Sequence, residues 1–220
     1  MRTAAVLPVK RFALAKQRLG ASIAERLRED LAGAMVADVI DTLAETPSIA
    51  LTILVTAQPD LAPAGAPGTI IVDDDAESGQ SAAASLGIAR AVAEGFGRVL
   101  CVPGDCPALE PGELEQLLAD ARETEVVGIP DRHGSGTNGL LLSPPDAIAP
   151  SFGPESFARH RALARAAGVS WRVECPPSLL LDIDTGADLQ VLRERLAATN
   201  ARALRTRAAL ERAEPGRVTS

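Results

Sequence analysis

Short apolar runs alternate with longer helical segments along most of the chain, and this alternation constrains the fold more than any other feature. The runs are rich in branched aliphatic residues and are bounded by proline, glycine or polar residues, which is typical of strands. The first helical segment has an apolar residue every four positions from Ile23 to Leu43, behind a capping pair of Ser22 and Glu25. Strands joined by helical crossovers form parallel sheets, so the sequence predicts a doubly wound, mostly parallel α/β sheet flanked by helices.

The expected elements cover most of the sequence. We expect strands at residues 4–9, 50–55, 69–72, 99–103, 126–129 and 139–142, further extended segments at 171–174 and 179–182, and helices at 23–43, 81–94, 113–122, 157–167 and 187–196. With 220 residues, 46% of them hydrophobic, the chain can bury one substantial core, and we expect a single domain over residues 1–198. The Arg- and Ala-rich residues 199–220 suggest a solvated helix or frayed end, with a partner-binding arm as the alternative.

The composition excludes several classes of partner. Twenty-two basic and 29 acidic residues give a net charge of −7, which argues against nucleic acid. Three irregularly spaced cysteines fit neither a disulfide framework nor a zinc site, and we expect them to be inert. Neither a secretory segment nor an apolar window of ~18 residues is present, so we expect a soluble, cytoplasmic protein with no membrane partner.

A basic segment follows the first expected strand directly. It holds Lys10, Arg11, Lys16 and Arg18, and it contains no glycine before Gly20, so it is not a glycine-rich phosphate loop. Doubly wound sheets bind ligands at the carboxyl ends of their strands, where these side chains could contact a polyphosphate. A solvated loop is the alternative interpretation.

Acidic residues follow two other expected strands. Asp105 comes after the run at 99–103, and Asp182 and Asp184 come after a second apolar run. Alternation in an extended segment places Asp182 and Asp184 on one side, where two carboxylates repel each other unless a cation lies between them. Magnesium takes one or two carboxylates together with phosphate oxygens, so these residues are candidate metal ligands. The alternatives are that Asp105 caps a turn and that Asp184 with Thr185 caps the next helix.

Two further segments contain candidate ligand contacts. Residues 131–139 are rich in small and hydroxyl residues, and successive backbone N–H groups there could hold an anion. Ser156 is a candidate N-cap of the following helix, whose N-terminus would attract a carboxylate or phosphate. The two histidines, His133 and His160, have no predicted role, because a lone histidine in such a segment is more often an ordinary polar residue than a catalyst.

Four motifs in this order resemble the guanylyltransferases of coenzyme F-420 biosynthesis. They are Val-Lys-Arg-x-x-x-Ala-Lys-x-Arg-Leu from Val9, Gly-Asp-x-Pro-x-Leu from Gly104, Phe-Gly-x-x-Ser-x-x-x-His from Phe152 and Asp-x-Asp-Thr-x-x-Asp-Leu from Asp182. These enzymes belong to the wider nucleotidyltransferase group of glycosyltransferase-A-like fold, the nucleotide-diphospho-sugar transferase type. The resemblance implies the same fold here, with antiparallel insertions late in the chain.

The resemblance also implies roles for individual residues. It implies that Mg²⁺ is held by Asp105, Asp182 and Asp184, that Lys16, Arg18 and Asp105 serve catalysis, and that the acidic substrate is held by Thr137, Gly153 and Ser156. The nucleotide would be bound by the following residues: Pro8, Val9, Lys10, Lys16, Gly79, Gln80, Ser81 and Gly104. Gln80-Ser81 departs from the Gly-Leu-Asn that often holds the base in this fold.

The implied reaction joins GMP from GTP to a phosphorylated three-carbon acid and releases diphosphate. Phosphoenolpyruvate is the first choice, and 2-phospho-L-lactate and 3-phospho-D-glycerate are alternatives. The product would pass to a downstream transferase with a deazaflavin acceptor. A molybdenum-cofactor or sugar-phosphate nucleotidyltransferase is a more distant alternative, which the absence of an early Gly-Gly motif disfavours. A non-catalytic nucleotide-binding protein is another, and the oligomeric state does not follow from the sequence.

Overall fold

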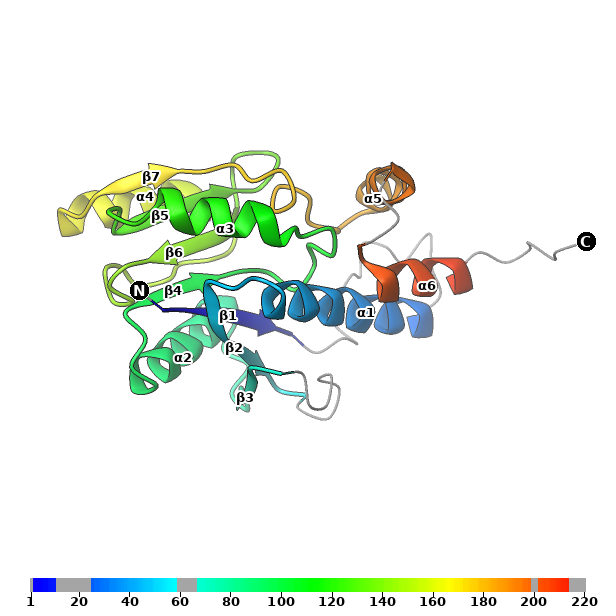
Figure 1. Ribbon diagram of the computed structural model, residues 1–220, viewed down its shortest axis with the longest axis horizontal. Coiled ribbons are helices and arrows are strands. Elements are labelled where there is room, and N and C mark those ends of the chain that lie inside the picture. The colour runs from blue at the N-terminus through cyan, green and yellow to red at the C-terminus, as the bar shows by residue number, and fades with distance from the viewer. Residues whose placement is uncertain (1, 11–24, 59–66, 199–201, 214–220) are drawn as a thin grey trace, which may run out of the picture.

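The structure is a computed structural model that describes residues 2–10, 25–58, 67–198 and 202–213 (Figure 1). Within these ranges the elements agree in type and order with nearly all of those expected. The strands are β1 (Thr3–Val9), β2 (Ile49–Thr56), β3 (Thr69–Asp73), β4 (Arg98–Cys101), β5 (Val126–Pro130), β6 (Thr137–Leu142) and β7 (Trp171–Val173). The helices are α1 (Glu25–Ala44), α2 (Gln80–Ala93), α3 (Pro111–Asp120), α4 (Ser156–Ala167), α5 (Gly186–Ala198) and α6 (Leu204–Ala213).

The described strands form one seven-stranded sheet in the order β3-β2-β1-β4-β6-β5-β7. Strands β1 to β4 are mutually parallel, and β6 runs antiparallel to both of its neighbours, β4 and β5. The first residues of β6 therefore lie at the same edge of the sheet as the carboxyl ends of β1 and β4. The predicted mostly parallel, doubly wound α/β fold is confirmed.

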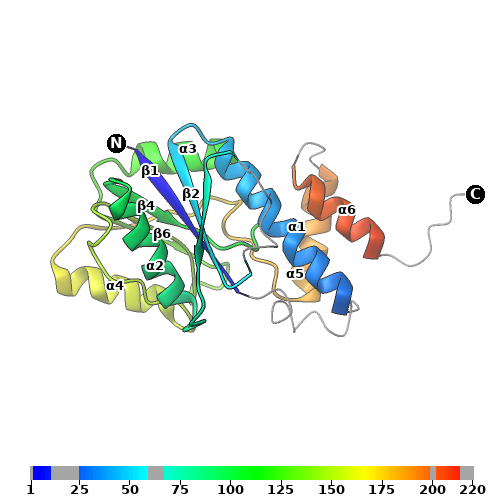
Figure 2. The ribbon, with the colours of Figure 1, turned by 90° about the horizontal axis from the view of Figure 1, so that it is seen from below.

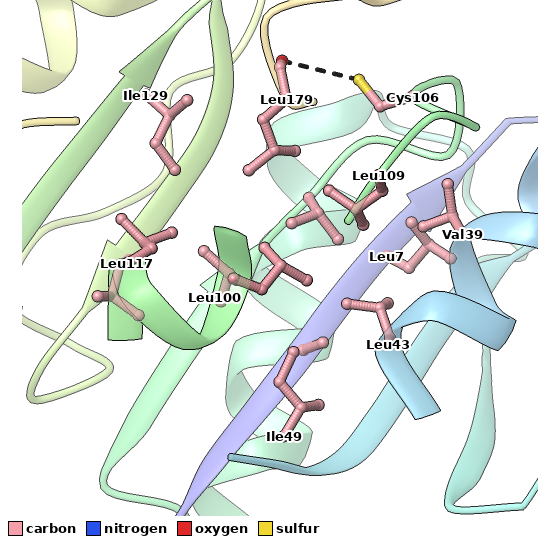
Figure 3. Packing of buried hydrophobic residues seen from close by; sticks show 14 of the residues in the cluster. Leu7, Val39, Leu43, Ile49, Leu100, Cys106, Leu109, Leu117, Ile129 and Leu179 are labelled. Atoms are coloured by element: carbon pink, nitrogen blue, oxygen red, sulfur yellow. Dashed lines mark hydrogen bonds between the residues drawn. The ribbon is translucent and has the colours of Figure 1, made fainter. Parts of the chain in front are cut away.

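Helices cover both faces of the sheet, with α1 and α3 on one face and α2 and α4 on the other (Figures 1 and 2). The alternation along β1 shows why both faces need a cover. Ala5 and Leu7 pack in the cluster with α1 and α3, whereas Ala4 and Val6 pack in the cluster with α2. Apolar side chains on both faces of a strand require helices on both sides, which is the arrangement of a buried parallel sheet. Figure 3 shows the first cluster, in which Leu7 and Leu100 lie against α1 and α3.

The segment at 179–182, which we expected to be extended, does not form a strand. Leu179 lies in a turn, and Leu181 and Asp182 have no regular secondary structure. Leu179 is nevertheless buried in the first cluster, and its carbonyl accepts a long hydrogen bond of 3.8 Å from Cys106 Sγ (Figure 3). The apolar run is buried by packing against the core rather than by pairing in the sheet.

The prediction of a helix in the C-terminal segment is confirmed by α6, but this helix packs against the core on one side rather than being solvated. Its Ala209 and Leu210 are buried against α1 and α5 (Figure 2). The carboxylate of Asp38, on α1, accepts hydrogen bonds from the backbone N–H groups of Arg205 at 3.1 Å and Thr206 at 2.8 Å. It thereby satisfies two donors at the start of α6.

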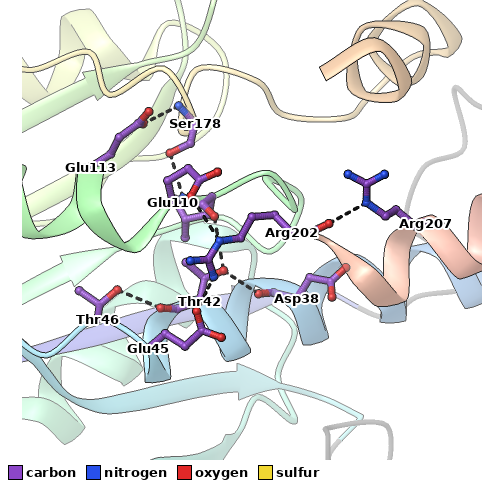
Figure 4. Close-up of polar contacts among 10 residues, drawn as sticks. Asp38, Thr42, Glu45, Thr46, Glu110, Glu113, Ser178, Arg202 and Arg207 are labelled. Carbon is purple, nitrogen blue, oxygen red and sulfur yellow. Dashed lines mark hydrogen bonds and ion pairs between the residues drawn. The ribbon is translucent and has the colours of Figure 1, made fainter. Parts of the chain in front are cut away.

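Arg202 fixes the approach to α6 through two ion pairs. Its guanidinium contacts Glu45 at the end of α1 and lies 3.3 Å from Glu110, which precedes α3 (Figure 4). Glu110 is itself held by a hydrogen bond from its backbone N–H to Ser178 Oγ at 3.2 Å. Arg202, one of the arginines that suggested a solvated tail, therefore helps to hold the C-terminal segment against α1 and the residue before α3.

Two further observations concern the cysteines and the length and polarity of the helices. None of the three cysteines is in a disulfide, and Cys101 and Cys106 are buried. No helix in the described part of the chain has the length and apolar character needed to cross a membrane.

Candidate active site

A cavity of about 500 Å³ opens at the edge of the sheet where β1 and β4 end and β6 begins. It is formed where chain segments leave the sheet, which is where doubly wound folds bind ligands. Residues from β1, the turn after β4, the start of β6 and the segment before α5 contribute to it. The lining includes Pro8, Val9, Lys10, Asp74, Glu77, Gly79, Gln80, Gly104, Asp105, Asp131, Gly136, Thr137, Asn138, Gly153, Ser156, Asp182 and Asp184.

The structure brings together nearly all the predicted site residues that it describes. The nucleotide-binding candidates Pro8, Val9, Lys10, Gly79, Gln80 and Gly104, the acid-binding candidates Thr137, Gly153 and Ser156, and the metal candidates Asp105, Asp182 and Asp184 all line this cavity. Their individual roles stay predictions.

Ser81 is the exception among the described residues. Ser81 is not part of the lining; its Oγ accepts a hydrogen bond from the backbone N–H of Phe152 at 2.8 Å, which ties α2 to the loop that contains Gly153. Lys16 and Arg18 lie outside the described residues, as does the predicted cap at Ser22.

The acidic segment before α5 has the alternation that its sequence predicts. Ile183 is fully buried, and Asp182 and Asp184 line the cavity. The backbone N–H of Ile183 donates to the carbonyl of Asp105 at 3.1 Å, so the segment runs beside the turn after β4. Thr185 supplies the cap of α5: its Oγ1 accepts from the Asp188 N–H at 3.3 Å, and Asp188 Oδ2 accepts from the Thr185 N–H at 2.7 Å.

The described lining of the cavity is strongly acidic. Its only cation within the described ranges is Lys10, and its carboxylates are those of Asp74, Glu77, Asp105, Asp131, Asp182 and Asp184. Burial raises the pKa of the Asp182 carboxyl, the neighbouring charges of Asp105 and Asp184 raise it further, and a hydrogen bond from Asn138 opposes the rise. These carboxylates therefore interact, and a bound cation would relieve their repulsion.

Among the residues that the structure describes, no three acidic, cysteine or histidine side chains form a ready-made metal cage. Magnesium does not need such a cage, because it typically takes one or two carboxylates and completes its shell with phosphate oxygens and water. The pair of Asp105 and Asp182, with Asp184 beside them, fits an ion that is bound jointly with a phosphate group.

Asn138 is a site residue that the sequence did not single out. Its Nδ2 donates to the carbonyl of Leu179 at 2.8 Å and to Asp182 Oδ1 at 3.1 Å. It is buried at the start of β6 and so holds the acidic segment against the sheet. Its position next to Thr137 was the only sequence signal that it belongs to the site. Its hydrogen-bond partners could not be predicted, because they lie more than 40 residues away in the sequence.

The loop at 131–136 does not offer its backbone N–H groups to an anion in the way predicted. Asp131 accepts from the N–H groups of His133 and Ser135 at 3.0 Å through Oδ1, and from Gly136 at 2.8 Å through Oδ2. The carboxylate of Asp131 therefore takes the place of the bound anion that we expected at these N–H groups. It fixes the loop that leads into Thr137.

The second loop of the site is shaped by backbone conformation. Gly153 has φ +110°, a conformation that side chains rarely adopt. The prediction that Ser156 caps α4 is wrong: Glu155, with φ +55°, is the N-cap, and Ser156 is the first helical residue. The left-handed turn at Glu155 carries Ser156 into the helix, where its side chain lines the cavity and is almost fully buried.

Thr137 is joined to this second loop by a histidine. His160 Nδ1 lies 3.0 Å from Thr137 Oγ1, and His160 Nε2 accepts a hydrogen bond of 2.8 Å from the backbone N–H of Ser151. Burial, and to a lesser degree the charge of Arg159, lowers the pKa of His160 to about 4. The ring is therefore neutral at physiological pH.

Comparison with known proteins shows what this arrangement is similar to. A family model described as "Guanylyl transferase CofC like" matches residues 3–204. A phosphoenolpyruvate guanylyltransferase of Conexibacter woesei is 46% identical over 214 residues, with 96% of each chain covered. One from Sphaerobacter thermophilus is 37% identical over 192 residues, covering 87% of this chain and 93% of the relative.

Solved structures support the fold at much lower identity. A nucleotide-diphospho-sugar transferase structure from Desulfovibrio desulfuricans G20 matches with a TM-score of 0.74 at 16% identity, covering 96% of this chain and 95% of that chain. The CMP:2-keto-3-deoxy-manno-octonic acid synthetase, in complex with CTP, matches with a TM-score of 0.60 at 15% identity, covering 90% of this chain and 99% of that chain.

Proposed function

Because the chain belongs to the family of CofC-like guanylyltransferases, we propose that it transfers GMP from GTP to phosphoenolpyruvate and releases diphosphate. The relatives at 46% and 37% identity are named for that activity. The observation that carries the proposal is that the acid-binding candidates and the acidic cluster open into one cavity.

In the proposed reaction, an oxygen of the phosphoenolpyruvate phosphate attacks the α-phosphorus of GTP. A new P–O bond forms, the bond between the α-phosphorus and the bridging oxygen to the β-phosphate breaks, and diphosphate leaves with the bonding electrons. The nucleophile is already anionic, so the protein has only to bring two anions together in the right orientation and stabilise the charge. This requires neither a general base nor a covalent protein intermediate.

Charge neutralisation is the main demand on the site, because its described lining is acidic. Asp105, Asp182 and Asp184 would hold magnesium, which when bound would supply positive charge against the negative charge of the phosphate groups. Lys10 lies at the cavity, and Arg11, Lys16 and Arg18 follow it in sequence. We assign to these cations the remaining contacts with the triphosphate.

The acid end of the site offers neutral hydroxyl groups. Thr137 and Ser156 both line the cavity, and Gly153 leaves room for close approach of a ligand to the backbone. Neutral donors suit the carboxylate of a small acid whose phosphate is directed toward the metal.

Asp74 is the best candidate for contact with the base. It follows β3, lines the cavity and is 8% exposed, and its Oδ1 has no hydrogen-bond partner among the described residues. A buried carboxylate matches guanine, which presents two adjacent donors on one edge, better than cytosine or adenine, which each present one amino group there. Leaving such a group unmatched is costly, which favours GTP over the other nucleotides.

A thermal-shift titration tests the nucleotide part of the proposal. GTP with Mg²⁺ should raise the melting temperature, because a ligand that binds only the folded state stabilises it. The rise should be smaller without Mg²⁺ and in an Asp105→Asn variant. Equal shifts with GTP, CTP and ATP would contradict guanine selection, and equal shifts with and without Mg²⁺ would contradict joint binding of metal and nucleotide.

The place of the product in a reaction sequence follows from its chemistry. An acid linked to guanosine through a diphosphate is an activated donor, so we propose that a second transferase consumes it, with the deazaflavin precursor of coenzyme F-420 as acceptor.

A further inference from the structure

His160 has a role that its burial and its two hydrogen bonds define. Its side chain is fully buried, on α4, and its ring packs edge-on against Phe152 with 5.1 Å between ring centroids. One ring nitrogen contacts Ser151 in the loop at 151–154, and the other contacts Thr137 at the start of β6. The ring thus joins the two segments that supply the acid-binding candidates.

The hydrogen bond to Ser151 fixes the tautomer of the ring. A backbone N–H can only donate, so Nε2 must be the unprotonated, accepting nitrogen. In a neutral imidazole the proton then lies on Nδ1, and this N–H donates to Thr137 Oγ1 over 3.0 Å.

The same reasoning fixes the hydroxyl of Thr137. Since Oγ1 accepts from His160, the hydroxyl hydrogen must point elsewhere, and Thr137 lines the cavity. The remaining donor of this side chain is thereby available to a ligand oxygen. A hydroxyl that is free to rotate would lose this preference, because it could also turn its hydrogen toward another acceptor.

We propose that His160 is a positioning residue that commits the Thr137 hydroxyl to donate into the acid-binding part of the cavity. The inference rests on the proposed function only for the identity of the acceptor, which would be an oxygen of phosphoenolpyruvate. It predicts selectivity for a ligand group that only accepts, a carboxylate or phosphate, over one that presents a hydrogen.

His160 is not needed merely to anchor the loop at 151–154, because the neighbouring Arg159 also anchors it. Arg159 donates from Nε to Ser151 Oγ at 3.1 Å and from a terminal nitrogen to the Ser151 carbonyl at 2.9 Å. The loop at 151–154 therefore has an anchor that does not involve His160. Loss of the His160 contact with Thr137 should affect substrate binding more than it affects the position of the loop.

The first experiment reads the tautomer directly and needs no substrate. The chain has two histidines, so ¹⁵N-histidine NMR with a His133→Gln variant assigns both rings. His160 should be the neutral Nδ1–H tautomer at pH 7. An Nε2–H tautomer or a doubly protonated ring would overturn the proposal, whatever substrate the enzyme uses.

The second experiment tests the consequence for binding by a double-mutant cycle. His160→Gln keeps an acceptor for Ser151 and removes the donor at the Nδ1 position, whereas His160→Asn keeps a donor there. His160→Gln should raise the Michaelis constant for phosphoenolpyruvate about tenfold and leave that for GTP within about twofold, a loss of ~1.4 kcal/mol in acid binding. His160→Asn should recover part of the loss.

Thr137→Val closes the cycle. Adding His160→Gln to Thr137→Val should change the Michaelis constant for the acid less than twofold, because the hydroxyl through which His160 acts is already gone. Multiplicative effects, or an equal rise in the GTP constant, would overturn the proposal. If the parent enzyme turns over no three-carbon acid, the proposed function fails, while the tautomer measurement still decides the role of His160.

Discussion

Asn138→Ala should both destabilise the protein and weaken its use of Mg²⁺. The side chain is 7% exposed and makes two hydrogen bonds, to the neutral Leu179 carbonyl at 2.8 Å and to the Asp182 carboxylate at 3.1 Å. A typical net value is ~1 kcal/mol for the first and ~1.5–3 kcal/mol for the second, so the free energy of unfolding should fall by about 2.5–4 kcal/mol.

The effect on Mg²⁺ follows from the charge balance at Asp182. The hydrogen bond from Asn138 lowers the pKa of Asp182 against the larger effect of burial, so its removal lets the pKa rise further. A carboxyl with a higher pKa is ionised less at a given pH and binds a cation less well. The Mg²⁺ concentration at half-maximal activity should therefore increase in the variant, and more so at pH 6 than at pH 8.

Urea unfolding and a Mg²⁺ titration of the rate provide the two measurements. Gln116→Ala is the matched control, because its side-chain amide also donates to an aspartate, Asp120, at 2.8 Å, but on the exposed surface of α3. That variant should stay within ~0.5 kcal/mol of the parent. If Asn138→Ala behaves like Gln116→Ala in both measurements, the argument that Asn138 holds the acidic segment is refuted.

Three further predictions concern other parts of the molecule. Burial lowers the pKa of His160 from 6.5 to about 4. The neutral ring therefore contributes roughly 3 kcal/mol to the free energy of unfolding above pH 6.5, and this contribution is lost as the pH falls toward 4. In urea unfolding, the free energy of unfolding should decrease less between pH 7 and 4.5 for His160→Gln than for the parent. Lys16→Ala and Arg18→Ala should each cost ~1.5–3 kcal/mol in GTP binding or transfer, and unchanged kinetics in both would make the segment a solvated loop. Leu210→Ala should lower the free energy of unfolding by about 2–5 kcal/mol, because the side chain is buried between α6 and its neighbours, whereas an unchanged urea midpoint would mean that α6 adds no stability.

The sequence predicts those features that depend on local pattern. Strand and helix periodicity gave the fold, and the rule that ligands bind at the carboxyl ends of strands placed Lys10, Asp105 and Asp182 at one cavity. The alternation around Ile183 correctly separated the two aspartates that line the cavity from the isoleucine in the core.

What the sequence missed depends on contacts between distant segments. The partners of Asn138 and His160 lie on other elements, and nothing in the local pattern distinguishes these residues from ordinary polar ones. Asp131 was overlooked because a carboxylate that binds its own loop has no sequence signature that separates it from a ligand-binding residue. The packing of α6 was not predicted because the arginines of residues 199–220 outnumber the apolar residues, such as Ala209 and Leu210, that pack against α1 and α5.

Product formation is the measurement that tests the central claim most directly. The purified protein should be incubated with GTP, Mg²⁺ and one of three acids in separate reactions: phosphoenolpyruvate, 2-phospho-L-lactate or 3-phospho-D-glycerate. The nucleotide-linked acid is detected by mass, and the released diphosphate is quantified. A downstream transferase with its deazaflavin acceptor can trap unstable adducts. The account predicts Mg²⁺-dependent enolpyruvyl-diphosphoguanosine, formed fastest from phosphoenolpyruvate and at least a hundredfold more slowly by Asp105→Asn, on the order of the several kcal/mol that a catalytic metal supplies. Diphosphate release with none of the three acids, or turnover of Asp105→Asn within about tenfold of the parent at saturating Mg²⁺, would contradict it.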